Sequence, residues 1–184
     1  MKKLLIGCLW LMSNPLFAEQ IVDANFTPKN TVKTFQSQNA PKVTLDAAHF
    51  NFHTLDDRYK PFGKILEING FNLTQSTTKF SKEQLDKTDI LVIANALNEK
   101  NVKDWDLPNF SAFSRAEIDA EGWLQGATLE FHKGRIAVFG EAAMFTAQLS
   151  GEKDQQIKMG LNAEGAEQNE QFLLNVMHWL TRKI

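Results

Sequence analysis

The chain has 184 residues and a formal net charge of −2, and it is 43% hydrophobic and 23% charged, with one cysteine. This composition is typical of a single globular domain. It excludes a disordered chain, a collagen, a disulfide-stapled miniprotein and a polytopic membrane protein. The near-balanced charge also argues against a nucleic-acid partner, which needs a basic protein face.

Residues 1–18 have the layout of a secretory signal peptide. Lys2 and Lys3 form a basic region, an apolar stretch runs from Leu4 to Met12, and Ala18 is a small residue that suits the position before a cleaved bond. The apolar stretch is too short to cross a bilayer, which takes ~20 residues. We therefore predict cleavage after Ala18, a periplasmic protein, and no membrane span after cleavage.

An alternative treats the sequence LIGC at residues 5–8 as the lipobox of a bacterial lipoprotein, with Cys8 acylated. Almost no apolar region would then separate Lys3 from the lipobox, so a lipoprotein is the less favoured prediction. If the signal peptide is cleaved after Ala18, Cys8 leaves with it, and the exported chain has no thiol for a disulfide or a nucleophile.

The remaining pattern predicts an extended N-terminal arm at 19–41 and one α/β domain at 42–184. Short apolar runs alternate with segments of helical periodicity, and the tight sequence HKG at 132–134 predicts a late β-hairpin. The expected strands are 42–46, 71–74, 89–95, 127–131 and 135–139, and the expected helices are 58–69, 81–85, 141–149 and 167–182.

Polar side chains are densest just after the first predicted strand. Ligands of open α/β sheets bind beyond the carboxyl ends of the strands, so this segment is the first candidate site. Glu141 is added because it follows a later strand, where it could pair with a histidine as an acid or base, or merely stabilise a helix start. The candidate ligand-binding residues are Asp46, His49, Asn51, His53, Arg58 and Glu141.

Three interpretations of this polar segment remain open. It could be a rigid loop anchored by Phe50 and Phe52, a small-molecule or catalytic site, or a metal site. The four-residue spacing of His49 and His53 suits zinc only on a helix, and a third ligand would have to be assumed. We therefore predict no metal and no cofactor.

Four sequence strings resemble a known family. They are DAAHFNFHT at 46–54, DILVIANA at 89–96, GEAAMFTAQ at 140–148, and the segment 166–175 in the last predicted helix. Together they are similar to exported bacterial proteins of unknown function related to class I glutamine amidotransferases. The resemblance implies a flavodoxin-like, parallel-rich three-layer sandwich, and it implies no settled activity.

The chain departs from this family after a helix capping box at Ser114–Glu117. Family members continue into a full helix, a central strand and a turn at the position of the nucleophile elbow, whereas this chain passes directly to the hairpin. We therefore expect a sandwich that lacks one central strand. We also expect the hairpin to move in beside the strand at 89–95; otherwise the open edge of that strand would favour pairing with another chain.

Two functional hypotheses and one further alternative follow. The favoured one is an exported domain that binds an unknown small molecule or protein partner and has no glutaminase activity. The other is a hydrolase in which His49 or His53 is the base and Asp46 or Glu141 orients it. A degraded remnant without an independent role is the third possibility.

Overall fold

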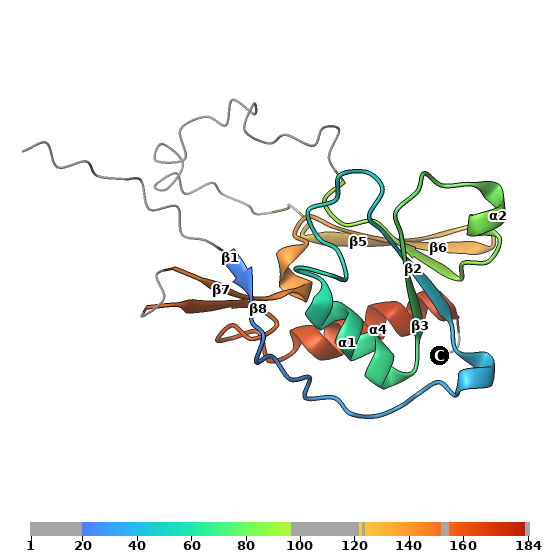
Figure 1. Ribbon diagram of the computed structural model, residues 1–184. Helices are drawn as coiled ribbons and strands as arrows, with labels where there is room; N and C mark the ends of the chain where they lie inside the picture. Colours follow the sequence, from blue (N-terminus) through green and yellow to red (C-terminus); the bar gives the residue numbers. More distant parts are fainter. Residues whose placement is uncertain (1–19, 97–121, 123, 152–154, 183–184) are drawn as a thin grey trace, which may run out of the picture.

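The computed structural model describes residues 20–96, 122, 124–151 and 155–182. Helices and strands alternate along the first part of the chain, as predicted, and the chain is of mixed α/β type (Figure 1). The described strands form three separate sheets, of which one is parallel. The capping box at 114–117 lies outside the described residues.

The parallel sheet has the strand order β3–β2–β4. Its strands are β2 (Lys42–Asp46), β3 (Asn72–Ser76) and β4 (Ile90–Val92), close to where apolar runs predict them. β2 is the central strand and is buried almost throughout, because it is paired on both edges. Asp46, at its carboxyl end, is fully buried.

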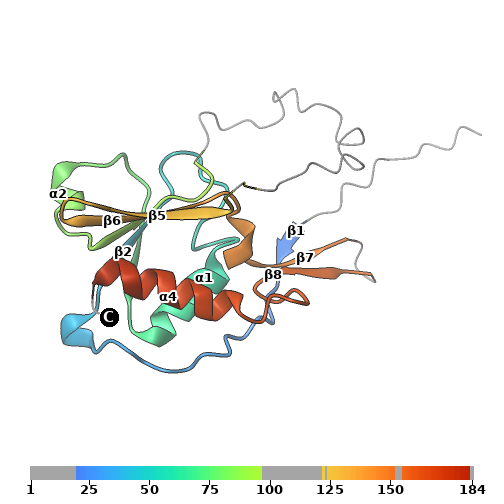
Figure 2. The same cartoon turned by 180° about the vertical axis from the view of Figure 1, so that it is seen from behind.

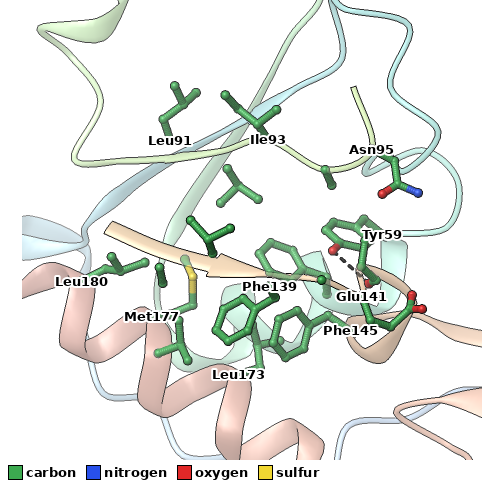
Figure 3. Close-up of a pocket in the computed structure, with 18 residues that line it drawn as sticks. Tyr59, Leu91, Ile93, Asn95, Phe139, Glu141, Phe145, Leu173, Met177 and Leu180 are labelled. Carbon is green, nitrogen blue, oxygen red and sulfur yellow. Dashed lines mark hydrogen bonds between the residues drawn. The ribbon is translucent and has the colours of Figure 1, made fainter. Parts of the chain in front are cut away.

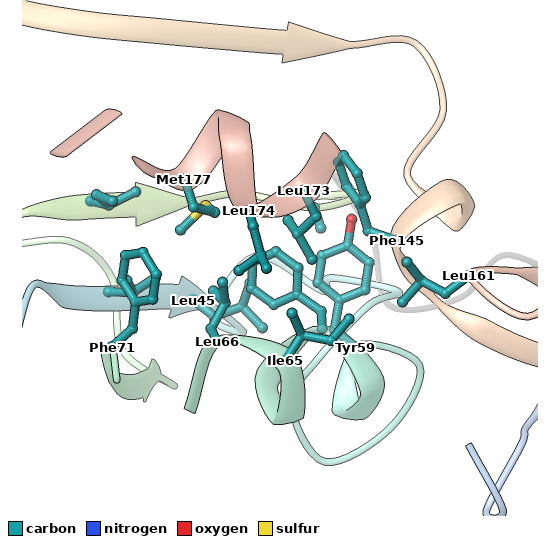
Figure 4. Packing of buried hydrophobic residues seen from close by; sticks show 14 of the residues in the cluster. Leu45, Tyr59, Ile65, Leu66, Phe71, Phe145, Leu161, Leu173, Leu174 and Met177 are labelled. Atoms are coloured by element: carbon teal, nitrogen blue, oxygen red, sulfur yellow. The ribbon is translucent and has the colours of Figure 1, made fainter. Parts of the chain in front are cut away.

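Two helices cover one side of this sheet. They are α1 (Lys60–Asn69) and α4 (Asn169–Thr181), which lie on the same side of the sheet in both views (Figures 1 and 2). Their apolar faces meet β2 in the main core, whose largest members include Leu45, Leu66 and Leu173 (Figure 4). The periodic apolar residues of both predicted helices therefore form the core, as expected. The short helix α2 (Lys82–Leu85) precedes β4.

The late hairpin forms as predicted, from β5 (Gly126–Phe131) and β6 (Gly134–Phe139). The expectation that it joins the sheet beside β4 is wrong, because among the described strands β5 and β6 pair only with each other. One face of the hairpin packs on α4, where the Arg135 guanidinium lies 4.9 Å from the Trp179 ring and Phe139 contacts Phe172. This packing on α4, and not a strand ladder, holds the hairpin.

A second antiparallel sheet has the order β1–β7–β8 and was not expected. It consists of β1 (Gln20–Val22), β7 (Ala147–Ser150) and β8 (Ile157–Gly160). The predicted helix at 141–149 is wrong. The chain instead makes the 3₁₀ helix η3 (Ala143–Phe145) and then enters β7, which β1 and β8 both pair.

The N-terminal arm predicted at 19–41 begins as β1 and then runs along the two helices to the 3₁₀ helix η1 (Ser37–Asn39) (Figure 1). Glu170 of α4 fixes it, because its carboxylate accepts hydrogen bonds from the backbone N–H groups of Lys29 at 2.9 Å and Asn30 at 2.6 Å. The arm is thus attached to the domain by hydrogen bonds. Within the described ranges, no helix has the length and apolar character needed to cross a membrane.

Candidate functional site

Three of the predicted site residues form one hydrogen-bonded group at the carboxyl end of β2, here named the Asp46 cluster (Asp46, His49 and Asn51). The buried Asp46 carboxylate accepts hydrogen bonds from His49 Nδ1 at 2.9 Å, from Asn51 Nδ2 at 3.0 Å and from the backbone N–H of Ala48 at 3.1 Å. A carboxylate only accepts, so His49 carries a proton on Nδ1. Nε2 is therefore the ring nitrogen that can exchange a proton with a ligand.

The Asp46 cluster is tied to the end of β4. Asn51 Nδ2 also donates to the Ala94 carbonyl oxygen at 3.2 Å, and the Phe52 N–H donates to the Asn95 carbonyl oxygen at 3.1 Å. Phe50 and Asn95 both have positive φ angles, of 52° and 43°. Such angles are uncommon for residues other than glycine and are often found at functional sites.

His53 is buried apart from the Asp46 cluster, with its ring against Phe52 and Tyr59. Its Nδ1 has no hydrogen-bond partner. Burial lowers the pKa of His53, and the nearby Arg58 charge lowers it further, while Glu141 and Asp57 oppose the shift. His53 is therefore neutral at pH 7.

Arg58 does not join the other candidates. Its guanidinium stacks on Phe52 at 4.0 Å, and it donates to the Asp57 carboxylate and to the Gln20 carbonyl oxygen. These contacts join the loop after β2 to β1. Arg58 therefore has a structural role on the side of β1.

Glu141 stands just after β6, and its Oε1 accepts a hydrogen bond from the Ala143 N–H at 2.6 Å. This bond satisfies a backbone donor at the start of η3. Glu141 is not the first-turn residue of a helix that the structural alternative expected, because η3 starts at Ala143 and has no acidic residue in its first turn. No ion pair to Glu141 is present among the described residues. One carboxylate oxygen is thus left for a ligand.

A pocket of about 400 Å³, here named the β4–β6 pocket, lies between these two strands. α4 forms its floor, and the core side of α1 closes one end (Figure 3). Most of its lining is apolar, and Tyr59, Asn95 and Glu141 lie together at one end (Figure 3). The apolar side chains that define it include Leu91, Val92, Phe139, Leu173, Val176, Met177 and Leu180.

The polar end of the pocket has fixed donor and acceptor groups. The Tyr59 hydroxyl donates to the Ala142 carbonyl oxygen at 3.0 Å, and burial, assisted by the Glu141 charge, strongly raises the pKa of Tyr59. The phenol is therefore neutral at pH 7. It can accept a hydrogen bond from a ligand, beside the carboxylate of Glu141.

The candidate residues thus fall into three groups. Asp46, His49 and Asn51 are joined by hydrogen bonds, and Glu141 lines the pocket. His53 is buried against aromatic rings, and Arg58 lies beside β1. No group of three or more possible metal ligands is found in the part of the chain that the structure describes.

Sequence reasoning missed Tyr59 as a pocket residue, whereas Asn95 stands at the carboxyl end of a predicted strand, where ligands of α/β sheets bind, although it was not among the candidate residues. Tyr59 belongs to the apolar pattern before α1, so its hydroxyl gave no separate signal. Asn95 had a signal, because an Asn that ends a buried strand is suited to a positive φ. The pocket floor on α4 was predicted only as core, since nothing in the sequence shows that β4 and β6 do not pair.

Comparisons of the chain with protein-family models, with curated proteins and with solved structures find no match.

Proposed function

We propose that the chain is an exported α/β binding domain of amidotransferase-like ancestry that holds a small molecule or a partner segment in the β4–β6 pocket, without glutaminase activity. The observation that carries the proposal is the pocket itself, about 400 Å³ in volume, apolar over most of its lining and polar at one end. Small-molecule sites usually combine these properties.

The lining indicates the chemistry of the ligand. The apolar floor on α4 favours a hydrocarbon body, and the Glu141 carboxylate favours a positively charged or hydrogen-bond-donating group at the other end. A ligand with an ammonium group and an apolar chain matches both features.

The ancestry is supported by the positions of the family-like strings. DAAHFNFHT spans the end of β2 and the Asp46 cluster, DILVIANA spans β4, and GEAAMFTAQ spans the turn after β6. All three border the pocket or its neighbouring cluster. A parent with a flavodoxin-like three-layer sandwich and a strand between β4 and β6 would leave such a pocket after losing that strand. The only cysteine of the chain is Cys8, so no thiol is available at this site.

The test is the melting temperature of the processed protein with hexylammonium, hexanol and hexanoate. A ligand at ten times its Kd stabilises by about 1.4 kcal/mol, which is ~3–5 °C for a domain of this size. We expect hexylammonium to give the largest shift and hexanoate the smallest. No shift with these probes or with a broad metabolite panel would overturn the proposal.

A pair of tryptophan variants on α4 supplies the control. Val176→Trp places an indole on the pocket floor and should abolish the shift, whereas Asn175→Trp lies on the exposed side of the same helix and should retain it. Loss of the shift in both variants would indicate general damage to α4.

A hydrolase is the second candidate, and the hydrogen bond of 2.9 Å between Asp46 and His49 favours it. In this function Asp46 orients the imidazole, and His49 Nε2 takes a proton from water or from a substrate hydroxyl. The His49 side chain is 36% exposed, so a ligand can approach the imidazole. The other proposed pair receives no such support, because no hydrogen bond joins His53 to Glu141.

Hydrolysis of a panel of esters and amides tests this candidate. His49→Gln should remove activity, and Asp46→Asn should reduce it while shifting its pH profile. Activity that persists in His49→Gln would exclude the mechanism.

Export is proposed from the layout of residues 1–18. Intact-mass analysis of the protein from a two-membrane bacterium should find an N-terminus at Glu19. A lipid-modified Cys8 at the new terminus would favour the lipoprotein instead.

A further inference from the structure

Two strand edges lie on opposite sides of the β4–β6 pocket, and neither is paired with another strand that the structure describes. Among the described strands, β4 is bonded to β2 and β6 is bonded to β5. Residues 91–95 line one side of the pocket and residues 137–139 line the other. Unpaired backbone groups of strand edges are templates for the addition of a further strand.

We propose that the natural occupant of the pocket is an extended segment of a partner protein, added as a strand between β4 and β6, with a basic group at the Glu141 end. This inference deepens the proposed function and rests on it, because it assigns the chemical class of the ligand. The backbone of the segment would bond to β4 and β6, and these bonds would make the parallel sheet and the hairpin one continuous sheet.

The floor of the pocket explains the side chains that such a segment needs. Successive side chains of a strand point to opposite faces. Every second residue would therefore point toward α4, where the half-buried Val176 and Leu180 line the pocket above the buried Leu173. Apolar side chains of moderate size, such as valine, fit these positions. The intervening residues would point away from α4, on the side where Ile93 is 54% exposed and Val138 is 62% exposed.

Charge complementarity indicates the end group. Glu141 and the Tyr59 hydroxyl lie at one end of the pocket, and no lysine or arginine is among the described residues that line it. A lysine side chain or a free α-amino group of the partner would pair with the Glu141 carboxylate. An acidic group there would be repelled.

The probe is the peptide Lys-Val-Thr-Val-Thr-Val with an acetylated N-terminus and an amidated C-terminus, so that the lysine side chain is its only basic group. Two matched peptides are a version that begins with Glu, and a version N-methylated at alternate residues, which keeps the side chains but loses backbone donors. Binding is followed by calorimetry on the processed full chain, and hydrogen exchange reports the backbone amides. We expect slower exchange at amides of residues 90–93 and 135–139 when the first peptide binds.

We also expect the Glu peptide to bind about ten times more weakly, and the N-methylated peptide to show no binding. Glu141→Gln should remove most of the difference between the Lys and Glu peptides. Val176→Trp should abolish binding of the Lys peptide, and Asn175→Trp should not.

Other outcomes overturn the inference. If hexylammonium binds and the peptide does not, the proposed function stands and the inference fails. If neither binds, both fail. The decisive amides are those of β4 and β6 that do not bond to β2 or β5. If these amides are already protected in the free monomer, the chain's own residues 97–121 fill the pocket; if their protection depends on protein concentration, a second copy fills it.

Discussion

Asn51 donates a side-chain hydrogen bond to the Ala94 carbonyl oxygen over 3.2 Å, while the same nitrogen donates to Asp46 over 3.0 Å. One amide therefore joins the end of β2 to the end of β4. Because Ala94 lines the β4–β6 pocket, a shift of the Asp46 cluster moves the wall of the pocket. The two candidate sites are thus joined by a hydrogen bond.

Replacing Asp46 measures how much its hydrogen bonds contribute to the free energy of unfolding. Asp46→Ala leaves the donors of Ala48, His49 and Asn51 without their shared acceptor in a buried position. Unsatisfied buried donors cost about 1–3 kcal/mol each, with relaxation lowering the sum, so we expect a loss of ~2–4 kcal/mol. Urea unfolding measures it.

The matched control for this change is Asp86→Ala. Asp86 is exposed and pairs with Lys82 on the surface of the protein. It should change the free energy of unfolding by less than ~0.5 kcal/mol. An equally small effect of Asp46→Ala would mean that the cluster is not a structural tie.

The depressed pKa of His53 predicts a pH dependence of stability. The folded state binds a proton at His53 less readily than the unfolded state, in which the pKa is 6.5. The free energy of unfolding should therefore be constant above this pH and decrease as the pH falls below it. Burial shifts the pKa of His178 in the same direction.

The measurement is urea unfolding at a series of pH values between 5 and 8 in the parent chain and in His53→Phe. The variant should show a shallower decrease below pH 6.5, and the double variant with His178→Phe a shallower one still. Identical slopes in all three proteins would contradict the assignment of His53.

Gly70 ends α1 with a φ of 98° and lies against the backbone of Phe35. A Cβ at this position would collide with the Phe35 carbonyl oxygen. Gly70→Ala should destabilise the chain through both the strained φ and this collision, by ~2–4 kcal/mol.

Gly165→Ala separates the two causes. Gly165 also has a positive φ, of 79°, but a Cβ there would meet nothing within 4 Å. It should cost only the backbone strain, ~1 kcal/mol. Melting curves of the two variants give the difference, and equal losses would show that the contact with Phe35 does not matter.

The hydrogen bonds of Glu170 should keep the N-terminal arm attached to α4. Glu170→Ala removes the acceptor for the backbone N–H groups of Lys29 and Asn30. We expect faster cleavage of residues 24–36 in limited proteolysis, with little change in far-ultraviolet circular dichroism. Glu83→Ala, which removes only an exposed pair with Lys87, should leave the cleavage rate unchanged.

The local sequence pattern predicted the strands and helices that form the main core, including β2 and α1. The strand at β2 has the predicted bounds, and the stop at Gly70 ends α1 as expected. These elements are specified by short-range periodicity and by glycine conformation, which a sequence displays directly.

The arrangement of the hairpin and the β1–β7–β8 sheet could not be read in the same way. β7 has the sequence AQLS and β1 has QIV, and neither is long or alternating enough to indicate a strand. Their pairing depends on residues far apart in the chain. The hairpin sequence predicted the hairpin itself, but its attachment to α4 through Arg135 and Phe139 depends on tertiary contacts.

Only the part of the candidate site that is local in sequence could be predicted. Asp46, His49 and Asn51 are close in sequence, so a loop could be expected to bring them together. Glu141 and Tyr59 meet only through the fold. Arg58 lies within the same polar segment, yet its partner Gln20 belongs to β1, which the sequence did not reveal.

The pairing of β1 with β7 means that β1 joins its sheet late in folding. Gln20 lies opposite Ser150, and Val22 lies opposite Gln148. The first described strand therefore has no partner until most of the chain has left the ribosome, and contacts between such distant residues form slowly.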